Sequence, residues 1–174
     1  MPYPVKAIAN FFIKKAKTEN DTSLNLMKLL KLIYLAQGWS LALQDKPLIN
    51  ETIEAWAYGP VVPEIYHEFK HRAMLPIDDI ASDWDADDKG RIKVNNYEME
   101  FDKNTRALLN KIWDVYRPNS GIQLSNWSHK PEGAWHKVWY EEAGHKTRNL
   151  PIPHEYMKGY FNTLRNSHGN PGTN

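Results

Sequence analysis

The chain has 174 residues, of which 41% are hydrophobic and 25% charged, so it is long enough for one domain with a real core. Its net charge of +1 excludes a global field that would draw it to nucleic acid or to a membrane surface. The absence of cysteine excludes disulfides, thiolate metal sites and a cysteine nucleophile. With no signal-peptide pattern and no apolar run near ~20 residues, we expect a cytoplasmic protein without a membrane span.

Two helices are predicted at the N-terminal end. Apolar residues recur at helical spacing from Val5 to Ala16, and Pro4 suits the first turn. Residues 24–44 are apolar around nearly the whole circumference, which predicts a helix at the centre of the core. Gly38 lowers helix propensity there, so we expect it to permit close packing by a neighbouring element. The polar exceptions in this helix are Lys28, Lys31, Gln37 and Gln44.

The middle of the chain predicts short strands around one helix. Residues 52–58 alternate like a strand, which Gly59-Pro60 breaks. Pro63 can begin a helix that carries Ile65, Tyr66 and Phe69 on one side. Residues 77–90 are acidic and irregular, and residues 91–101 predict a hairpin with its turn at Asn95-Asn96.

The rest of the chain predicts helices. Asp102 is a suitable N-cap for a helix through Arg117. Ser120 and Gln123 form a capping-box pattern for a short helix that reaches Trp127. Helical turns over residues 135–143 and a last helix over residues 153–164 follow.

The predicted fold class is therefore mainly α (α+β). Residues 1–165 form a single compact helical domain with a small antiparallel β element, and residues 166–174 form a polar flexible tail.

One segment matches a zinc-protease pattern. Residues 67–71 spell H-E-x-x-H, so His67 and His71 could share a zinc ion on one helix face while Glu68 activates water. The downstream H-x-x-G-x-x-H extension is missing. The polar face of an amphipathic helix explains these residues better, and we expect neither a metal nor a cofactor.

A second segment resembles part of a calcium loop. Asp83, Asp85 and Asp87 match positions 1, 3 and 5, but Asp88 replaces the turn glycine and Val94 replaces the last glutamate. A solvated acidic loop is the better interpretation. No nucleophile elbow, phosphate-binding loop or dinucleotide-binding motif is present, so we expect no enzyme activity.

Lysines of the first two predicted helices suggest one further kind of partner. Lys14, Lys15, Lys17, Lys28 and Lys31 could form a basic patch for promoter DNA. Because the overall charge is near zero, the solvated face of ordinary helices is favoured.

Aromatic residues beside a stiff turn suggest a surface for a protein partner. A preordered turn loses little entropy on binding, and aromatics concentrate in interface hot spots. The candidate partner-binding residues are Trp56, Tyr58, Gly59, Pro60, Val61, Val62, Tyr66, His129 and Trp135. A purely structural role, in which the turn only closes the strand onto the long helix, is slightly favoured over partner contact for this segment.

Two blocks of sequence carry a family resemblance. KLLKLIYLAQGWSLAL (28–43) and KPLINETIEAWAYGPVVPEIYHEFK (46–70) resemble the SocA-like antitoxin domain, also called the Panacea domain, which occurs in phage-associated proteins of the GepA type. Residues 108–116, 124–135 and 152–161 continue the resemblance more weakly. Trp127-Ser128-His129 departs from the family, which more often has Thr before the His, and this leaves the role of His129 open.

The resemblance implies an antitoxin that neutralises a protein toxin by direct binding. It implies a cognate toxin as partner, with a cellular protease or promoter DNA as further candidates and no membrane. A zinc-dependent hydrolase and a DNA-binding autoregulator are the alternative functions.

Overall fold

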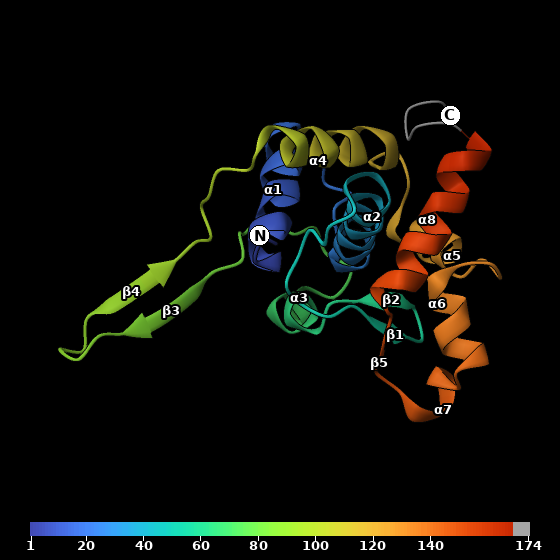
Figure 1. The fold of residues 1–174 in the computed structure, drawn as a ribbon. Helices are drawn as coiled ribbons and strands as arrows, with labels where there is room; N and C mark the ends of the chain where they lie inside the picture. The colour runs from blue at the N-terminus through green and yellow to red at the C-terminus, as the bar shows by residue number, and fades with distance from the viewer. Residues whose placement is uncertain (169–174) are drawn as a thin grey trace.

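Helix α2 runs through the centre of the fold, and the other long helices pack around it (Figure 1). The computed structural model describes residues 1–168 of the chain. The long helices are α1 (Val5–Thr18), α2 (Leu26–Gln44), α4 (Lys103–Tyr116), α5 (Gly121–Ser128) and α8 (His154–His168). Together with two small antiparallel sheets they confirm the predicted mainly α (α+β) class.

The apolar circumference of α2 explains its central position. Leu29, Leu32, Ile33 and Leu35 are fully buried because helices α1, α4, α5 and α8 and further elements pack against α2. By length and composition alone α2 could cross a membrane, but 89% of its apolar window is buried inside the fold, as in a core helix. Its N-terminus is capped by Asn25, whose side chain accepts a hydrogen bond from the Lys28 backbone N–H at 3.0 Å.

The predicted helix ends agree well where capping residues mark them. Asp102 caps α4 by accepting hydrogen bonds from the backbone of Asn104 and Thr105, both at 3.0 Å. Ser120 and Gln123 form the predicted capping box of α5. The predicted start of a helix at Pro63 is also confirmed, in α3 (Pro63–Phe69).

A three-stranded sheet in the order β2-β1-β5 covers one end of α2. Its strands are β1 (Glu54–Trp56), β2 (Gly59–Val61) and β5 (Leu150–Pro151). The predicted strand over residues 52–58 is shorter than expected, and Gly59-Pro60 begins the next strand instead of breaking the structure. Proline is tolerated there because β2 is an edge strand.

A second sheet forms an arm that projects from the body (Figure 1). It consists of β3 (Asp83–Ala86) and β4 (Ile92–Asn95), with Trp84 opposite Val94 and Ala86 opposite Ile92. The predicted turn at Asn95-Asn96 and the irregular acidic loop are therefore wrong. The turn lies at residues 87–91, where Asp87 accepts backbone hydrogen bonds and Gly90 has a φ of 72°.

The C-terminal third differs in detail from the prediction. Residues 134–147 form α6 (Ala134–His136), the π-helix η2 (Lys137–Glu141) and α7 (Gly144–Thr147). Helix α8 ends at His168, three residues beyond the predicted end of the domain at residue 165. The remaining predicted tail residues, 169–174, lie outside the described residues.

Gly38 lets α8 approach α2 closely. A Cβ at this position would lie 2.2 Å from Cε2 of Phe161, and that ring is held by edge contacts with Tyr34 and Trp39. We therefore expect Gly38→Ala to lower the free energy of unfolding by about 1–3 kcal/mol, as overpacking outweighs the gain in helix propensity. Chemical denaturation measures this change.

Gly159 provides the matched control. It lies in α8, and a Cβ there would meet no atom within 4 Å. Gly159→Ala should therefore stabilise the protein by about 0.5–1 kcal/mol through helix propensity. Equal effects of the two substitutions would contradict the proposed role of Gly38.

Candidate functional site

The candidate site is an apolar groove between the N-terminal half of α2, the β1–β2 turn and α3 with the following 3-10 turn η1 (Lys70–Arg72). Its volume is about 520 Å³. We call it the Lys31 groove. Ten of its lining residues are apolar or aromatic: Leu26, Met27, Leu30, Trp56, Ala57, Tyr58, Val61, Tyr66, Ala73 and Met74. The other two are Lys31 and Lys70.

Aromatic residues form the wall opposite α2. The rings of Trp56 and Tyr66 meet edge to face, with centroids 4.9 Å apart, which joins β1 to α3. The Trp56 indole N–H donates to Glu54 Oε2 at 2.7 Å, so its polar atom is satisfied. The Tyr58 side chain is 73% exposed at the turn. This wall therefore combines two fixed rings with one accessible ring.

Gly59 is required by the geometry of the turn. Its φ of 104° lies in a region that other residues rarely adopt. A Cβ would also lie 2.6 Å from both Lys31 Cε and Ser128 Oγ. Because Gly59 has no side chain, the turn can lie directly over the end of the Lys31 side chain.

Lys31 is the most unusual group in the groove. It lies on α2 and is only 2% exposed. Its ammonium donates one hydrogen bond, to the Pro60 carbonyl oxygen, at the long distance of 3.3 Å. Burial lowers the pKa of Lys31 from its ordinary value of 10.5 to about 7.

Side chains behind the turn hold it in place. Ser125 Oγ donates to the Tyr58 carbonyl oxygen at 2.8 Å, and the Trp135 indole N–H donates to the Trp56 carbonyl oxygen at 2.8 Å. The His129 ring lies against Trp135, with centroids 4.0 Å apart. Burial, together with the nearby charge of Lys31, lowers the pKa of His129. These residues support the groove from α5 and α6.

The structure separates the predicted partner-binding residues into two groups. Trp56, Tyr58, Val61 and Tyr66 line the groove. The others do not line it: Gly59, Pro60, Val62 and Trp135 are buried, and His129 is half-buried behind the turn. The second group therefore forms or supports the turn.

Sequence reasoning missed the α2 side of the groove. Leu26, Met27 and Leu30 were assigned only to the core, and Lys31 was interpreted as a polar exception and as part of a possible basic patch. A lysine within a helix that is otherwise apolar all round was the available signal, but it applies equally to Lys28.

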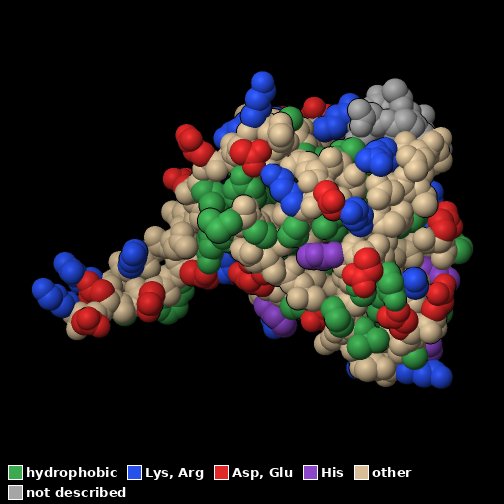
Figure 2. All heavy atoms as spheres, in the orientation of Figure 1, with side chains coloured by type: hydrophobic (Ala, Val, Ile, Leu, Met, Phe, Trp, Pro, Cys, Tyr) green, Lys and Arg blue, Asp and Glu red, His purple; other side chains and the backbone are tan. Residues whose placement is uncertain are grey.

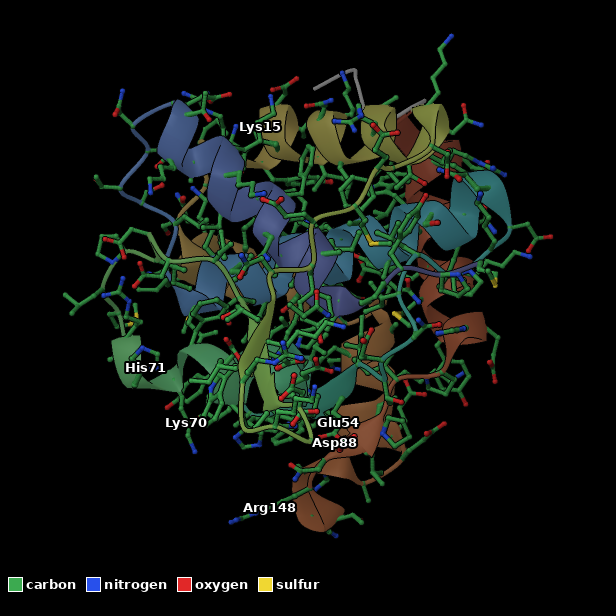
Figure 3. The ribbon with its side chains drawn as sticks, turned by 90° about the vertical axis from the view of Figure 1, so that its left-hand side faces the viewer. Lys15, Glu54, Lys70, His71, Asp88 and Arg148 are labelled. Carbon is green, nitrogen blue, oxygen red and sulfur yellow. The ribbon has the colours of Figure 1, made fainter. Side chains whose placement is uncertain are left out.

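The zinc-protease pattern does not assemble a ligand set. His67 lies in the last turn of α3 and His71 in η1, so the two are not on one regular α-helix, and both are exposed; Figure 3 shows His71 beside Lys70 at this helix end. Glu68 forms an ion pair with Lys6 at 3.0 Å. Within residues 1–168, no three histidine or acidic side chains are grouped as a metal site would need.

The predicted basic patch is also not formed. Lys28 and Lys31 are buried in the core, Lys14 pairs with Glu98 at 3.0 Å, and Lys15 lies 3.8 Å from Glu19. Figure 2 likewise shows acidic and basic side chains interspersed on the visible face and on the arm. The five lysines therefore do not share one surface.

Comparisons with known proteins identify the family of this chain. A family model described as "Antitoxin SocA-like, Panacea domain" matches residues 29–136, more than half of the chain. Antitoxin SocA of Caulobacter vibrioides (strain NA1000 / CB15N) is 39% identical over 64 residues, which cover 37% of this chain and 34% of that protein. The chain thus matches about a third of the length of this curated relative. No solved structure matches. The protein belongs to the SocA-like antitoxin (Panacea domain) family.

Proposed function

We propose that this protein is a non-enzymatic, cytoplasmic antitoxin that neutralises a protein toxin by direct binding, and that the Lys31 groove receives part of the toxin. The observation that carries the proposal is an apolar groove with an aromatic wall inside the segment that the family model matches. Exposed grooves of this kind mark interaction sites, because apolar surface gains free energy when a partner covers it.

The chemistry of the groove favours a protein partner. Trp56, Tyr58 and Tyr66 are residue types that concentrate in interface hot spots, and the turn that carries Tyr58 is braced by Ser125 and Trp135. A braced turn loses little entropy on binding. A volume of about 520 Å³ suits a few inserted side chains, with the rest of the toxin resting on the surrounding surface.

Co-expression with the product of the neighbouring gene tests the proposal. We expect that product to arrest growth alone, to be harmless when this chain is present, and to co-purify with it. If no neighbouring product is toxic, or if the toxic product neither binds nor is neutralised, the proposal is wrong.

Tyr58 is the groove residue best suited to a binding test, because it is 73% exposed and its removal leaves the core intact. We expect Tyr58→Ala to weaken toxin binding by about 30-fold, the effect of losing a hot-spot side chain of about 2 kcal/mol. Calorimetry with the purified toxin measures this change. Tyr140→Ala is the matched control: Tyr140 is 56% exposed but lies outside the groove, so its loss should leave the affinity unchanged.

A further inference from the structure

Three lysines are buried within residues 1–168, and among them Lys31 lacks adequate partners. Lys6 pairs with Glu68 at 3.0 Å and with Asp83 at 2.5 Å. Lys28 donates to Ser23 Oγ at 2.7 Å and to the Arg117 carbonyl oxygen at 2.6 Å. Lys31 has one hydrogen bond of 3.3 Å and no ion pair within the described residues. A lysine ammonium has three donors, so Lys31 retains unused hydrogen-bonding capacity.

The groove that Lys31 lines has basic residues but no acidic residue in its lining. Its charged lining residues are Lys31 and Lys70, and no carboxylate is among the residues that line it. Figure 3 shows Lys70 extending from the end of α3. A buried cation is costly unless an anion pairs with it, so this groove is complementary to a negative group.

We propose that the Lys31 groove binds an aspartate or glutamate side chain of the partner protein, flanked by apolar residues, and that its carboxylate pairs with the Lys31 ammonium. This inference rests on the proposed function, because it specifies the chemistry of the toxin segment that enters the groove. The carboxylate would replace the long hydrogen bond to Pro60 with charge-assisted ones.

An internal acidic side chain fits better than a chain terminus. Apolar residues lie on both sides of Lys31, with Met27 and Leu30 on α2 and with Val61 and Trp56 on the strands. A segment that continues past its carboxylate in both directions can cover both apolar walls. The pKa of Lys31, which burial lowers, also favours such a ligand, because the carboxylate draws a proton onto the amine when it binds.

Two small probes test this chemistry without the toxin. 3-Phenylpropionate carries an aromatic ring and a carboxylate, and 3-phenylpropionamide has the same shape without the charge. Binding is followed by the NMR shift of the Trp56 indole N–H, which is assigned by its loss in Trp56→Phe. We expect the acid to bind at least about 10-fold more tightly than the amide, because only the acid pairs with the buried charge.

Lys31→Met is the decisive variant. It keeps an apolar stem in the groove and removes the amine, so we expect the preference for the acid to disappear. Lys17→Met makes the same substitution at an exposed position of α1, and it should retain the preference. Lys70→Met, at the exposed rim, should reduce the preference only a few-fold. Thermal melts show that each variant is folded.

The outcomes separate this inference from the proposed function. Equal binding of acid and amide to the wild-type protein, or an unchanged preference in Lys31→Met, would overturn the carboxylate site while leaving toxin binding intact. With the toxin itself, an Asp→Asn or Glu→Gln scan should find one position whose change weakens wild-type binding about 10-fold or more but does not affect Lys31→Met. Absence of any such position would also overturn the inference, whereas absence of toxin binding would contradict the proposed function.

Discussion

Lys31→Met is expected to raise the free energy of unfolding at pH 7 by roughly 3 kcal/mol. The substitution removes a buried amine with one long hydrogen bond and replaces it with an apolar side chain of similar length. In the native state burial lowers the pKa of Lys31 to about 7, whereas the unfolded chain holds its proton at the ordinary value of 10.5. Urea denaturation of both proteins measures the difference.

The pH dependence of wild-type stability provides a second check on this prediction. Between pH 7 and pH 9 the unfolded chain binds one proton that the native state has released, so wild-type stability should rise with pH, by roughly 1 kcal/mol per pH unit from this group. Below about pH 7 both states hold the proton and the contribution becomes flat. Burial also lowers the pKa of Lys28, but that group is common to both proteins. The charge of Lys31 lowers the pKa of His129, so the difference between the proteins reports Lys31 together with His129.

A more stable Lys31→Met protein that no longer distinguishes acid from amide would show that Lys31 is retained for binding at the expense of stability. If Lys31→Met is instead less stable than the wild-type protein, and the stability of both proteins changes equally with pH, then the hydrogen bond to Pro60 is sufficient to stabilise the buried amine.

Trp113→Ala is expected to lower the free energy of unfolding by about 3–5 kcal/mol, a large part of the total for a domain of this size. Trp113 on α4 is fully buried, stacks on Phe12 of α1 with centroids 6.5 Å apart, and donates its indole N–H to Glu19 Oε2 at 3.0 Å. Its removal leaves a cavity where α1 and α4 meet. The change is measured by denaturation or, where the variant does not accumulate, by its soluble yield.

Trp84→Ala is the control for tryptophan loss. Trp84 lies on the projecting arm and is 75% exposed, so we expect a change within about 0.5 kcal/mol. A similar cost for the two substitutions would mean that the arm packs against the body in solution, contrary to the arrangement in Figure 1.

Local signals explain the elements that sequence predicted well. The caps Asp102 and Ser120 act through hydrogen bonds to residues two or three positions away, so they mark helix starts without information from the rest of the fold. The apolar circumference of α2 likewise predicts burial on every side.

Strand pairing was predicted less well, because the partner of a strand lies elsewhere in the chain and local sequence patterns do not identify it. The alternation of Trp84 and Ala86 matches that of Ile92 and Val94, yet the acidic residues between them suggested an irregular loop. Strand β5 pairs with β1 from almost a hundred residues away, and its two residues give no strand signal of their own.

The sequence alone determined the fold class, the family and the aromatic turn that forms one wall of the site. Only the tertiary structure decided what that turn faces. Lys28 and Lys31 are both lysines on the same apolar helix, and no local pattern distinguishes them. Folding gives Lys28 the hydroxyl of Ser23 and the carbonyl oxygen of Arg117, while it places Lys31 under Gly59 with one long hydrogen bond beside an open groove. Burial and hydrogen bonding depend on which distant segments meet, and these give Lys28 two short hydrogen bonds and Lys31 one long one.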